Sequence, residues 1–201
     1  EMIPTTAPPT RNLHAGDDWA DARPVYAVWE VTLRCDQPCA HCGSRAGPSR
    51  TSELDTREAL EVAAALVALG CKEVALIGGE AYLREDLPQI VSFFAEREVR
   101  VAIQTGGRRF TVELARSLRA AGLWQVGVSV DGPEDVHDVL RGNRGSHASA
   151  LRAMDAARDA GLEISANSQI NRLNAHLLRE SCAELRAHVA RMDDAVRTLR
   201  A

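Results

Sequence analysis

The feature of this sequence that most restricts its fold is a regular alternation of short β-branched runs with amphipathic helical stretches. The runs predict strands over residues 25–33, 73–77, 99–104, 123–130 and 162–170. Between them, the pattern predicts helices over 56–69, 85–97, 111–121 and 146–160. Three of these helices stop at a glycine that is followed almost at once by a strand, namely Gly70, Gly122 and Gly161. Parallel strands need such crossovers, so the sequence predicts an α/β fold of about five βα units with a parallel sheet, either doubly wound or curled toward a barrel.

The length and charge of the chain limit its class and its partners. With 201 residues, 45% of them hydrophobic and 26% charged, the chain has the composition of one ordinary globular domain. Its net charge is −4, from 24 basic and 28 acidic residues, and the arginines do not gather into a basic stripe. We therefore expect no nucleic-acid partner. The first helix is far shorter than the roughly 20 apolar residues of a membrane span, and the N-terminal residues lack the build of a signal peptide. We expect a cytoplasmic protein without membrane contact.

The sequence pattern divides the chain into three parts. Residues 1–24 contain four prolines and predict an extended arm, residues 25–173 form the expected α/β core, and residues 174–201 form an amphipathic helix. Apolar residues along that helix follow heptad spacing, namely Leu178, Cys182, Leu185, Val189, Met192, Val196 and Leu199. We expect the helix to pack on its own sheet or arm, and a dimer contact is the alternative.

Three of the five cysteines lie close together directly after the first predicted strand, namely Cys35, Cys39 and Cys42. In a reducing compartment such a group favours metal binding over disulfides. A structural zinc site is closed by four ligands, and here the fourth would have to come from a distant residue such as His14. On a four-iron cluster, three thiolates would leave one iron open for an exogenous ligand. The two isolated cysteines, Cys71 and Cys182, are expected to be small core residues.

Polar residues and glycines follow the other predicted strands as well. Ligands of parallel α/β folds bind at the carboxyl ends of the strands. The residues at these positions are Gly78, Gly79 and Glu80 after the second strand, Thr105 with Gly106 and Gly107 after the third, Ser129 and Asp131 with Gly132 at the fourth, and Asn167 and Gln169 at the fifth. Glycines let the backbone approach a ligand, and polar side chains supply its hydrogen bonds. The sequence therefore predicts one active-site rim that holds thiolates, a carboxylate and several donors.

The ordered combination of Cys-x3-Cys-x2-Cys after the first strand and Gly-Gly-Glu after the second resembles the radical S-adenosylmethionine (radical SAM) superfamily. The resemblance covers about residues 25–173 and implies a partial (β/α) barrel with a parallel sheet, incomplete here because no sixth βα unit is predicted. It implies that Cys35, Cys39 and Cys42 are the metal ligands of a [4Fe-4S] cluster whose fourth iron binds S-adenosylmethionine. Reduction would then cleave S-adenosylmethionine to a 5′-deoxyadenosyl radical, which abstracts a hydrogen from a substrate.

The same resemblance assigns the rim residues to S-adenosylmethionine. Gly78, Gly79 and Glu80 would bind its amino group, a pairing that opposite charges also favour. The alternative for Glu80 is a solvated acid at a helix start. The further assignments are Ser129 and Asp131 at the ribose, Asn167 or Gln169 near the nucleoside, His41 near the adenine, Thr105 on the cofactor-binding rim and Arg141 at the methionine carboxylate. For Arg141, a solvent-exposed i, i+3 pairing with Asp138 is the alternative. His137 is expected at the surface, and no catalytic residue is expected beyond the cluster ligands.

Two stretches, 128–132 and 137–142, resemble the branch of the family that modifies peptides or proteins and usually carries a C-terminal domain of the SPASM or twitch type. This implies a peptide substrate and an external electron donor such as flavodoxin or ferredoxin. The chain departs from that branch because it lacks the sixth βα unit and the cysteines for auxiliary clusters, so we expect a fragment, a truncated variant or a chain completed by a partner. The alternatives are an enzyme acting on a small metabolite, a non-catalytic iron–sulfur scaffold and a zinc-binding module.

Overall fold

The computed structural model describes residues 23–199, with side chains described up to residue 190. Its strands are β1 (Tyr26–Thr32), β2 (Glu73–Gly78), β3 (Arg100–Thr105), β4 (Gln125–Ser129) and β5 (Glu163–Asn167). Its helices are α1 (Thr56–Ala68), α2 (Leu87–Ala95), α3 (Val112–Ala120), α4 (Glu134–Arg141), α5 (Ser146–Asp159) and α6 (Leu178–Leu199), with short 3-10 turns η2 (Ala81–Leu83) and η3 (Ala175–Leu177). Every predicted strand and helix is present, with ends that differ from the prediction by at most four residues. The expected arm over 1–24 lies almost wholly outside the described residues.

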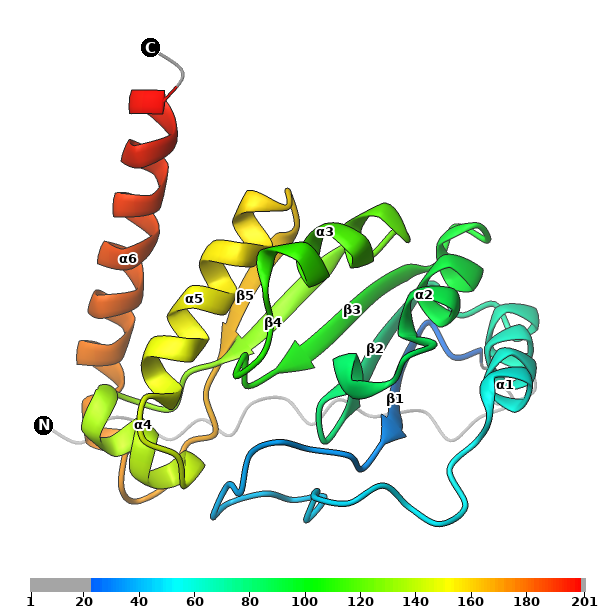
Figure 1. Ribbon diagram of the computed structural model, residues 1–201, viewed down its shortest axis with the longest axis horizontal. Coiled ribbons are helices and arrows are strands. Elements are labelled where there is room, and N and C mark those ends of the chain that lie inside the picture. Colours follow the sequence, from blue (N-terminus) through cyan, green and yellow to red (C-terminus); the bar gives the residue numbers. More distant parts are fainter. Residues whose placement is uncertain (1–22, 200–201) are drawn as a thin grey trace, which may run out of the picture.

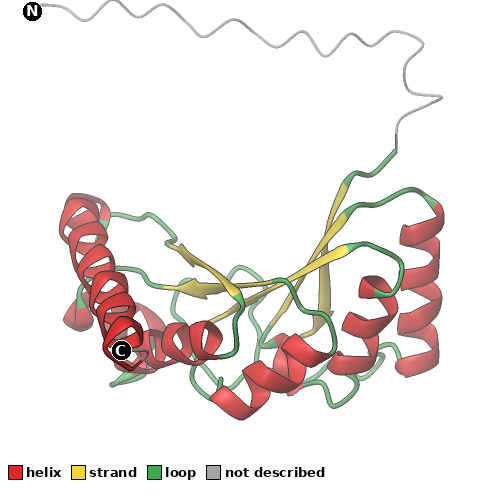
Figure 2. Cartoon of the chain, turned by 90° about the horizontal axis from the view of Figure 1, so that it is seen from above, coloured by secondary structure: helices red, strands yellow, loops and turns green. Residues whose placement is uncertain are grey.

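The five strands form one parallel sheet in which strand order follows chain order, β1-β2-β3-β4-β5. Because every crossover turns in the same direction, the connecting helices lie on one face of the sheet, and the sheet curves around its other face (Figures 1 and 2). A doubly wound sheet would instead reverse its order at a switch point. The structure therefore confirms the parallel α/β fold and shows an incomplete (β/α) barrel rather than a doubly wound sheet.

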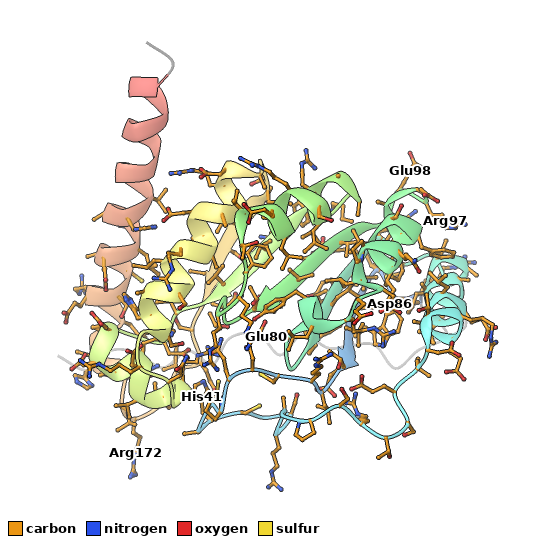
Figure 3. All side chains as sticks on the ribbon, viewed as in Figure 1. His41, Glu80, Asp86, Arg97, Glu98 and Arg172 are labelled. Atoms are coloured by element: carbon orange, nitrogen blue, oxygen red, sulfur yellow. The ribbon has the colours of Figure 1, made fainter. Side chains whose placement is uncertain are left out.

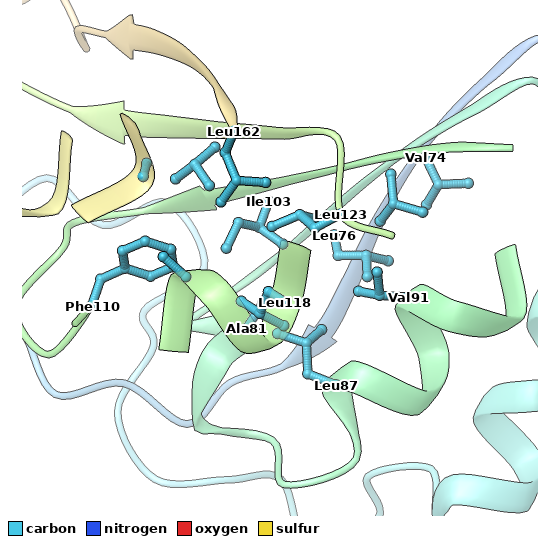
Figure 4. Packing of buried hydrophobic residues seen from close by; sticks show 14 of the residues in the cluster. Val74, Leu76, Ala81, Leu87, Val91, Ile103, Phe110, Leu118, Leu123 and Leu162 are labelled. Atoms are coloured by element: carbon cyan, nitrogen blue, oxygen red, sulfur yellow. The ribbon is translucent and has the colours of Figure 1, made fainter. Parts of the chain in front are cut away.

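The hydrophobic core lies between the sheet and its connecting helices (Figure 4). Alternate strand residues point into it, and Leu76 of β2 and Ile103 of β3 are completely buried there. The helices contribute further buried residues, namely Leu87, Ile90 and Phe94 from α2 and Leu118 from α3. The intervening strand residues face the concave side of the sheet. That side is thereby left for polar residues such as Gln104 and Ser129.

Local sequence signals set the ends of the connecting helices. At the start of α1, the Asp55 carboxylate accepts the Glu58 N–H (2.8 Å), and the Glu58 carboxylate accepts the Asp55 N–H (3.0 Å). This is a capping box, which satisfies two backbone donors at once. At the other ends, Gly70, Gly122 and Gly161 have φ angles of +89°, +99° and +74°, a region that favours glycine. The predicted glycine stops are confirmed.

Helix α4 was not predicted from the sequence, because it has only eight residues and few apolar ones. Its signals are nevertheless present, with acidic residues in the first turn and Gly142 as a left-handed C-cap. The prediction that His137 lies at the surface is wrong. The His137 side chain is completely buried where α4 packs on α5, with its ring centroid 5.4 Å from that of His147. The packing of this short helix on α5 buries a polar residue that the local sequence pattern places at the surface.

Helix α6 packs on the core over only part of its length and extends beyond the rest of the domain (Figure 1). Leu185, one of the residues at heptad spacing, packs against the core, as expected if the helix packs on its own sheet. Val189, the next such residue, is 42% exposed. Cys182 is exposed, so its prediction as a core residue is wrong. The last three residues at heptad spacing, Met192, Val196 and Leu199, lie beyond the described side chains. Within residues 23–199, no helix combines the length and the apolar character that a membrane span requires.

Candidate functional site

The three clustered cysteines line one cavity of about 500 Å³ at the carboxyl ends of the strands. They lie on the loop between β1 and α1, whose base is closed by hydrogen bonds from Cys35 N–H to Gly47 O (2.8 Å) and from Gly47 N–H to Leu33 O (2.9 Å). His41 of the same loop also lines the cavity, and the remaining walls come from the other strand ends and from α4, with the predicted residues Gly78, Gly79, Glu80, Thr105, Ser129, Asn167, Gln169 and Arg141. Of the thirteen residues assigned to the cluster or to S-adenosylmethionine, twelve line this cavity and Asp131 does not, and of the further rim glycines Gly106 lines it while Gly107 and Gly132 do not.

Gly78 and Gly79 let the end of β2 approach the cysteine loop. A Cβ atom on Gly79 would lie 2.7 Å from the Cβ of Cys35 and would overlap Arg34 O, and one on Gly78 would overlap Thr32 O. Any larger residue would therefore push β2 away from β1 and the loop. Both glycines also line the cavity. Their first role in the structure is to join two strand ends tightly, which the sequence pattern alone did not reveal.

Glu80 is a buried carboxylate in the cavity wall, only 3% exposed. Its Oε2 accepts the Thr105 hydroxyl (2.5 Å), and its Oε1 accepts the Gly106 N–H (2.7 Å). Burial outweighs these hydrogen bonds and raises the pKa of Glu80 to about 7. The alternative reading of Glu80 as a solvated helix-start acid is therefore wrong. Glu80 and His41 lie at the same edge of the sheet (Figure 3).

Groups that could bind a metal ion lie close to Glu80. One ligand atom each from Glu80, Cys35 and Asp36 lie within 4.8 Å of one another. The Asp36 carboxylate is shared with the Tyr82 hydroxyl (3.2 Å) and with Arg109 Nε (3.4 Å). A cation placed in the cavity at this point would favour the ionised form of Glu80, because an opposite charge nearby stabilises a carboxylate.

Burial also raises the pKa of two of the clustered thiols. The pKa of Cys35 rises to about 11, mainly through burial, and burial raises the pKa of Cys39 despite the nearby Arg141 cation. Arg141 Nη1 lies 3.7 Å from Cys39 Sγ. In the metal-free protein these thiols are therefore protonated at neutral pH, and metal binding would release their protons.

The donor set fits a cluster with three protein ligands and one open iron. Cys71 lies at the opposite end of β2, where its buried Sγ is 3.2 Å from Glu73 O, so its prediction as a core residue is confirmed. Cys182 lies on α6, and neither residue lines the cavity. His14, the candidate fourth zinc ligand, lies outside the described residues. Three thiols facing one cavity, with a carboxylate beside them, suit a site-differentiated iron–sulfur cluster better than a closed zinc site.

Arg141 pairs with Asp131 rather than with Asp138. Its Nε and Nη2 atoms each lie 2.7 Å from Asp131 Oδ2. The Asp138 carboxylate instead accepts the backbone N–H groups of Gly145 (2.5 Å) and His147 (2.9 Å). The alternative reading of Arg141 as a partner of Asp138 is therefore wrong.

Asp131 lies behind the cavity wall and not in it. Its side chain is completely buried, and it also contacts His41 Nε2 (3.3 Å) and accepts the Gln169 N–H (2.9 Å). In the structure its oxygens are engaged with Arg141, His41 and Gln169. It holds Arg141 and His41 in place, so its effect on the cavity passes through those two side chains.

Two amide side chains meet across the middle of the concave face. Asn167 Nδ2 donates to Gln104 Oε1 over Gly127, where a Cβ atom would overlap both groups. Gln104 lines the cavity and was not predicted as a site residue. Its position on β3, one residue before Thr105 and on the alternate face to the core, is the signal that could have found it.

A buried polar relay behind the cysteine loop also escaped prediction. Gln37, His137 and Ser146 are each at most 4% exposed. His137 Nδ1 accepts the Asp131 N–H (3.0 Å), His137 Nε2 lies 3.2 Å from Ser146 Oγ, and Ser146 Oγ donates to Gln37 Oε1 (3.4 Å). Glutamine and serine are mostly surface residues, so their burial here carried no signal in the sequence.

The buried His137 makes the stability of the fold depend on pH. Burial, reinforced by the Arg141 cation, lowers the pKa of His137 from 6.5 to about 4. A depressed pKa in the folded state gives stability that is present above pH 6.5 and is lost as the pH falls toward 4. We expect the free energy of unfolding to drop by about 3 kcal/mol from this group across that range, measured by urea unfolding at several pH values.

The substitution His137→Asn isolates this contribution. Relative to the wild type, it should remove the loss of stability that His137 contributes between pH 6.5 and 4, whereas the matched change His176→Asn, at an exposed position on η3, should leave the pH dependence as in the wild type. The same slope in the wild type and in His137→Asn would show that His137 does not titrate as its burial requires.

Comparisons with known proteins agree with this geometry. A family model described as the Radical SAM superfamily matches residues 29–170. The Fe-coproporphyrin III synthase of Methanosarcina barkeri is 34% identical over 155 residues, which are 77% of this chain and 39% of that protein. The mycofactocin maturase MftC of Mycobacterium tuberculosis is 34% identical over 164 residues, which are 80% of this chain and 41% of that protein. The chain thus spans less than half the length of these curated relatives.

The fold is similar to that of SuiB from Streptococcus suis, whose structure was solved with bound S-adenosylmethionine. The TM-score is 0.66 at 16% sequence identity, over 81% of this chain and 38% of SuiB. At that identity the likeness concerns the fold, and it agrees with the partial barrel. The family model covers most of the chain and includes the cysteine loop and the Gly-Gly-Glu segment. The chain belongs to the radical SAM superfamily, whose cofactors are a [4Fe-4S] cluster and S-adenosylmethionine.

Proposed function

We propose that this chain is the cofactor-binding part of an enzyme that reductively cleaves S-adenosylmethionine and uses the resulting radical to abstract a hydrogen from a substrate. The observation that carries the proposal is the meeting of Cys35, Cys39 and Cys42 with the buried Glu80 at one cavity. When bound, the reduced cluster supplies the electron that cleaves S-adenosylmethionine to methionine and a 5′-deoxyadenosyl radical. The chain's own residues have to bind and orient these two cofactors.

Glu80 is the group suited to the amino end of S-adenosylmethionine. Its buried carboxylate is held by Thr105 and Gly106, and an ammonium beside it would restore the charge that burial disfavours. Gly78 and Gly79 leave the wall beside it free of side chains. Thr105 therefore acts on the ligand through Glu80, as a positioning residue.

The methionine carboxylate and the nucleoside of S-adenosylmethionine would face the remaining walls of the cavity. The Arg141 guanidinium lines the cavity and is steadied by Asp131, so it suits the methionine carboxylate. The side chains proposed for the nucleoside are Ser129 at the ribose, Asn167 or Gln169 beside it, and His41 at the adenine. For Asp131 we propose support of Arg141 and His41 in place of the ribose contact expected from the sequence.

The substrate class we favour is a peptide, with an external donor such as flavodoxin or ferredoxin supplying the electron. The stretches 128–132 and 137–142, which resemble the peptide-modifying branch, form the end of β4 and most of α4 at the cavity. A small metabolite is the alternative. One relative is named a mycofactocin maturase, but another of the same identity is named an Fe-coproporphyrin III synthase, so sequence identity does not choose between the substrate classes. Both substrate classes would be reached by the same radical chemistry.

The experiment that tests the proposal is anaerobic reconstitution followed by turnover with S-adenosylmethionine and dithionite. We expect about four irons per chain and release of 5′-deoxyadenosine and methionine, detected by mass spectrometry. Stoichiometric zinc without iron after anaerobic purification would contradict the cluster and favour a zinc module. A full cluster without any cleavage of S-adenosylmethionine would instead identify a non-catalytic iron–sulfur scaffold.

A further inference from the structure

The middle one of the three clustered sulfurs has a charged hydrogen-bond donor from outside the cysteine loop. The other two accept a backbone N–H of the loop itself, Cys35 Sγ that of Gln37 (3.4 Å) and Cys42 Sγ that of Ala46 (3.3 Å). In the described part of the chain, Cys39 Sγ instead receives its donor from Arg141 at the end of α4, whose Nη1 lies 3.7 Å away. The guanidinium nitrogen thus faces the sulfur directly.

The C-terminal end of α4 is docked on the cysteine loop, and this places its last residue, Arg141, beside the loop. The Leu140 carbonyl accepts the Ala40 N–H (2.9 Å). On the other side of the arginine, a Cβ atom on Gly142 would overlap Pro38 O, so the helix end and the loop are in close contact there. The two contacts flank the middle cysteine in the loop and Arg141 in the helix. They therefore fix the backbone from which the guanidinium reaches the sulfur.

Asp131 holds the guanidinium from its other edge. Arg141 Nε and Nη2 each lie 2.7 Å from Asp131 Oδ2, which leaves Nη1 toward Cys39. The Asp131 side chain is completely buried, and that of Arg141 is only 13% exposed. A guanidinium paired with a buried carboxylate keeps one orientation, because its planar fork is already in place for the contact. The contact with sulfur is thus a fixed part of the fold rather than one position of a solvated side chain.

A fixed cation beside a ligand sulfur acts on the charge of the group that the sulfur binds. Reduction adds one electron to an iron–sulfur cluster, so the reduced form is the more negative one and gains more from a nearby positive charge. Hydrogen bonds to the sulfurs and the local charge are among the factors that set the reduction potential of a cluster. Because Arg141 is mostly buried, solvent ions screen its charge little. The expected effect is therefore a higher potential.

We propose that Arg141 Nη1 donates a hydrogen bond to Cys39 Sγ when this sulfur is a ligand of the bound cluster, and that the guanidinium thereby raises the reduction potential of the cluster. Asp131 and the docked end of α4 orient the guanidinium. The inference rests on the proposed function, since it requires the cluster. It goes beyond the proposed contact of Arg141 with the methionine carboxylate, for which the guanidinium keeps further N–H groups on Nη1 and Nη2.

The test is a redox titration of the anaerobically reconstituted chain, with dithionite as reductant and the paramagnetic signal of the reduced cluster as readout. S-adenosylmethionine is left out, so that its carboxylate cannot contribute. Arg141→Gln removes the cation, while the new amide can still donate to Asp131. We expect the ratio of reduced to oxidised cluster at a fixed potential to fall about tenfold, which lowers the midpoint by about 59 mV for a one-electron couple.

Arg144→Gln is the matched control, because it makes the same change in net charge at an exposed position of the loop between α4 and α5. Its midpoint should equal that of the wild type. An unchanged midpoint in Arg141→Gln at full iron content would overturn the proposal. An equal fall in both variants would also overturn it, because the effect would then belong to the net charge of the chain.

Arg141→Lys decides the matter if Arg141→Gln binds no iron. A lysine ammonium is a compact charge without the planar fork, so it cannot hold Asp131 and reach Cys39 in the way that the guanidinium does. The midpoint should still fall, by less than in Arg141→Gln, and an unchanged midpoint would overturn the proposal. Failure of both variants to bind iron would assign Arg141 to cluster assembly and not to its potential, and would overturn the proposal as well.

Two further outcomes separate this proposal from the proposed function. Weaker binding of S-adenosylmethionine by Arg141→Gln at an unchanged midpoint would leave Arg141 with the methionine carboxylate alone, so the proposed function would stand and this inference would fail. A wild-type chain that binds no iron would be a failure of the proposed function itself, which iron analysis detects before any titration begins.

Discussion

Replacing Cys35, Cys39 or Cys42 by alanine is expected to abolish the iron–sulfur cluster. The three thiols line the cavity and are the proposed ligands of the cluster, so loss of one would leave two protein ligands for four irons. Iron and sulfide bound after anaerobic reconstitution should fall from about four per chain to near zero in each single variant. Iron analysis together with the visible absorption of the protein measures this directly.

The two other cysteines supply the controls for this prediction. Cys182→Ala changes an exposed thiol on α6 and should leave the iron content and the stability unchanged. Cys71→Ala changes a buried thiol at the start of β2, so it should keep the cluster while lowering the free energy of unfolding slightly. Loss of cluster in either control would show that the ligands are assigned wrongly.

The parallel fold was predictable because its signals are local. Asp55 and Glu58 cap α1, and three helices end at a glycine just before a strand, namely Gly70, Gly122 and Gly161. The alternation of helices and strands can therefore be predicted from short segments of the sequence. The choice between a doubly wound sheet and a barrel depends on the order of strands in space. That order is set by packing between distant segments, which no single window of the sequence contains.

The cavity was predictable by a rule of geometry, since the carboxyl ends of parallel strands share one edge of the sheet. The support behind the cavity was not. Asp131 sits next to a strand end like the true wall residues, but its carboxylate turns away to Arg141 and His41. His137 lies on a short helix whose apolar pattern is too brief to reveal which face is buried.

Buried polar groups account for most of what the sequence could not show. From the sequence alone, Gln37 and Ser146 are expected at the surface, because they are polar. Their burial depends on the packing of α4 and α5 against the cysteine loop. Helix α6 shows the opposite case. Its heptad spacing is regular, yet Leu185 packs on the core while Val189 stays exposed, because the sheet ends before the helix does.

Glu80→Gln is expected to weaken binding of S-adenosylmethionine while the cluster still assembles. The change keeps the shape of the side chain, and its Oε1 can still accept the Gly106 N–H. What it removes is the negative charge that the ammonium of the ligand would meet in a buried wall. A charged hydrogen bond contributes about 1.5–3 kcal/mol, so the dissociation constant should rise roughly 10- to 150-fold.

The measurement is the change in the paramagnetic signal of the reduced cluster as S-adenosylmethionine is added to the wild type and to the variant. Glu85→Gln is the matched control, because it neutralises an exposed carboxylate five residues further along the same segment. Its affinity should equal that of the wild type, and iron content should be the same in all three proteins. Equal affinity in Glu80→Gln would remove Glu80 from the ligand site. Burial disfavours the ionised form of this carboxylate, so a cationic ligand that binds beside it should depend strongly on its charge.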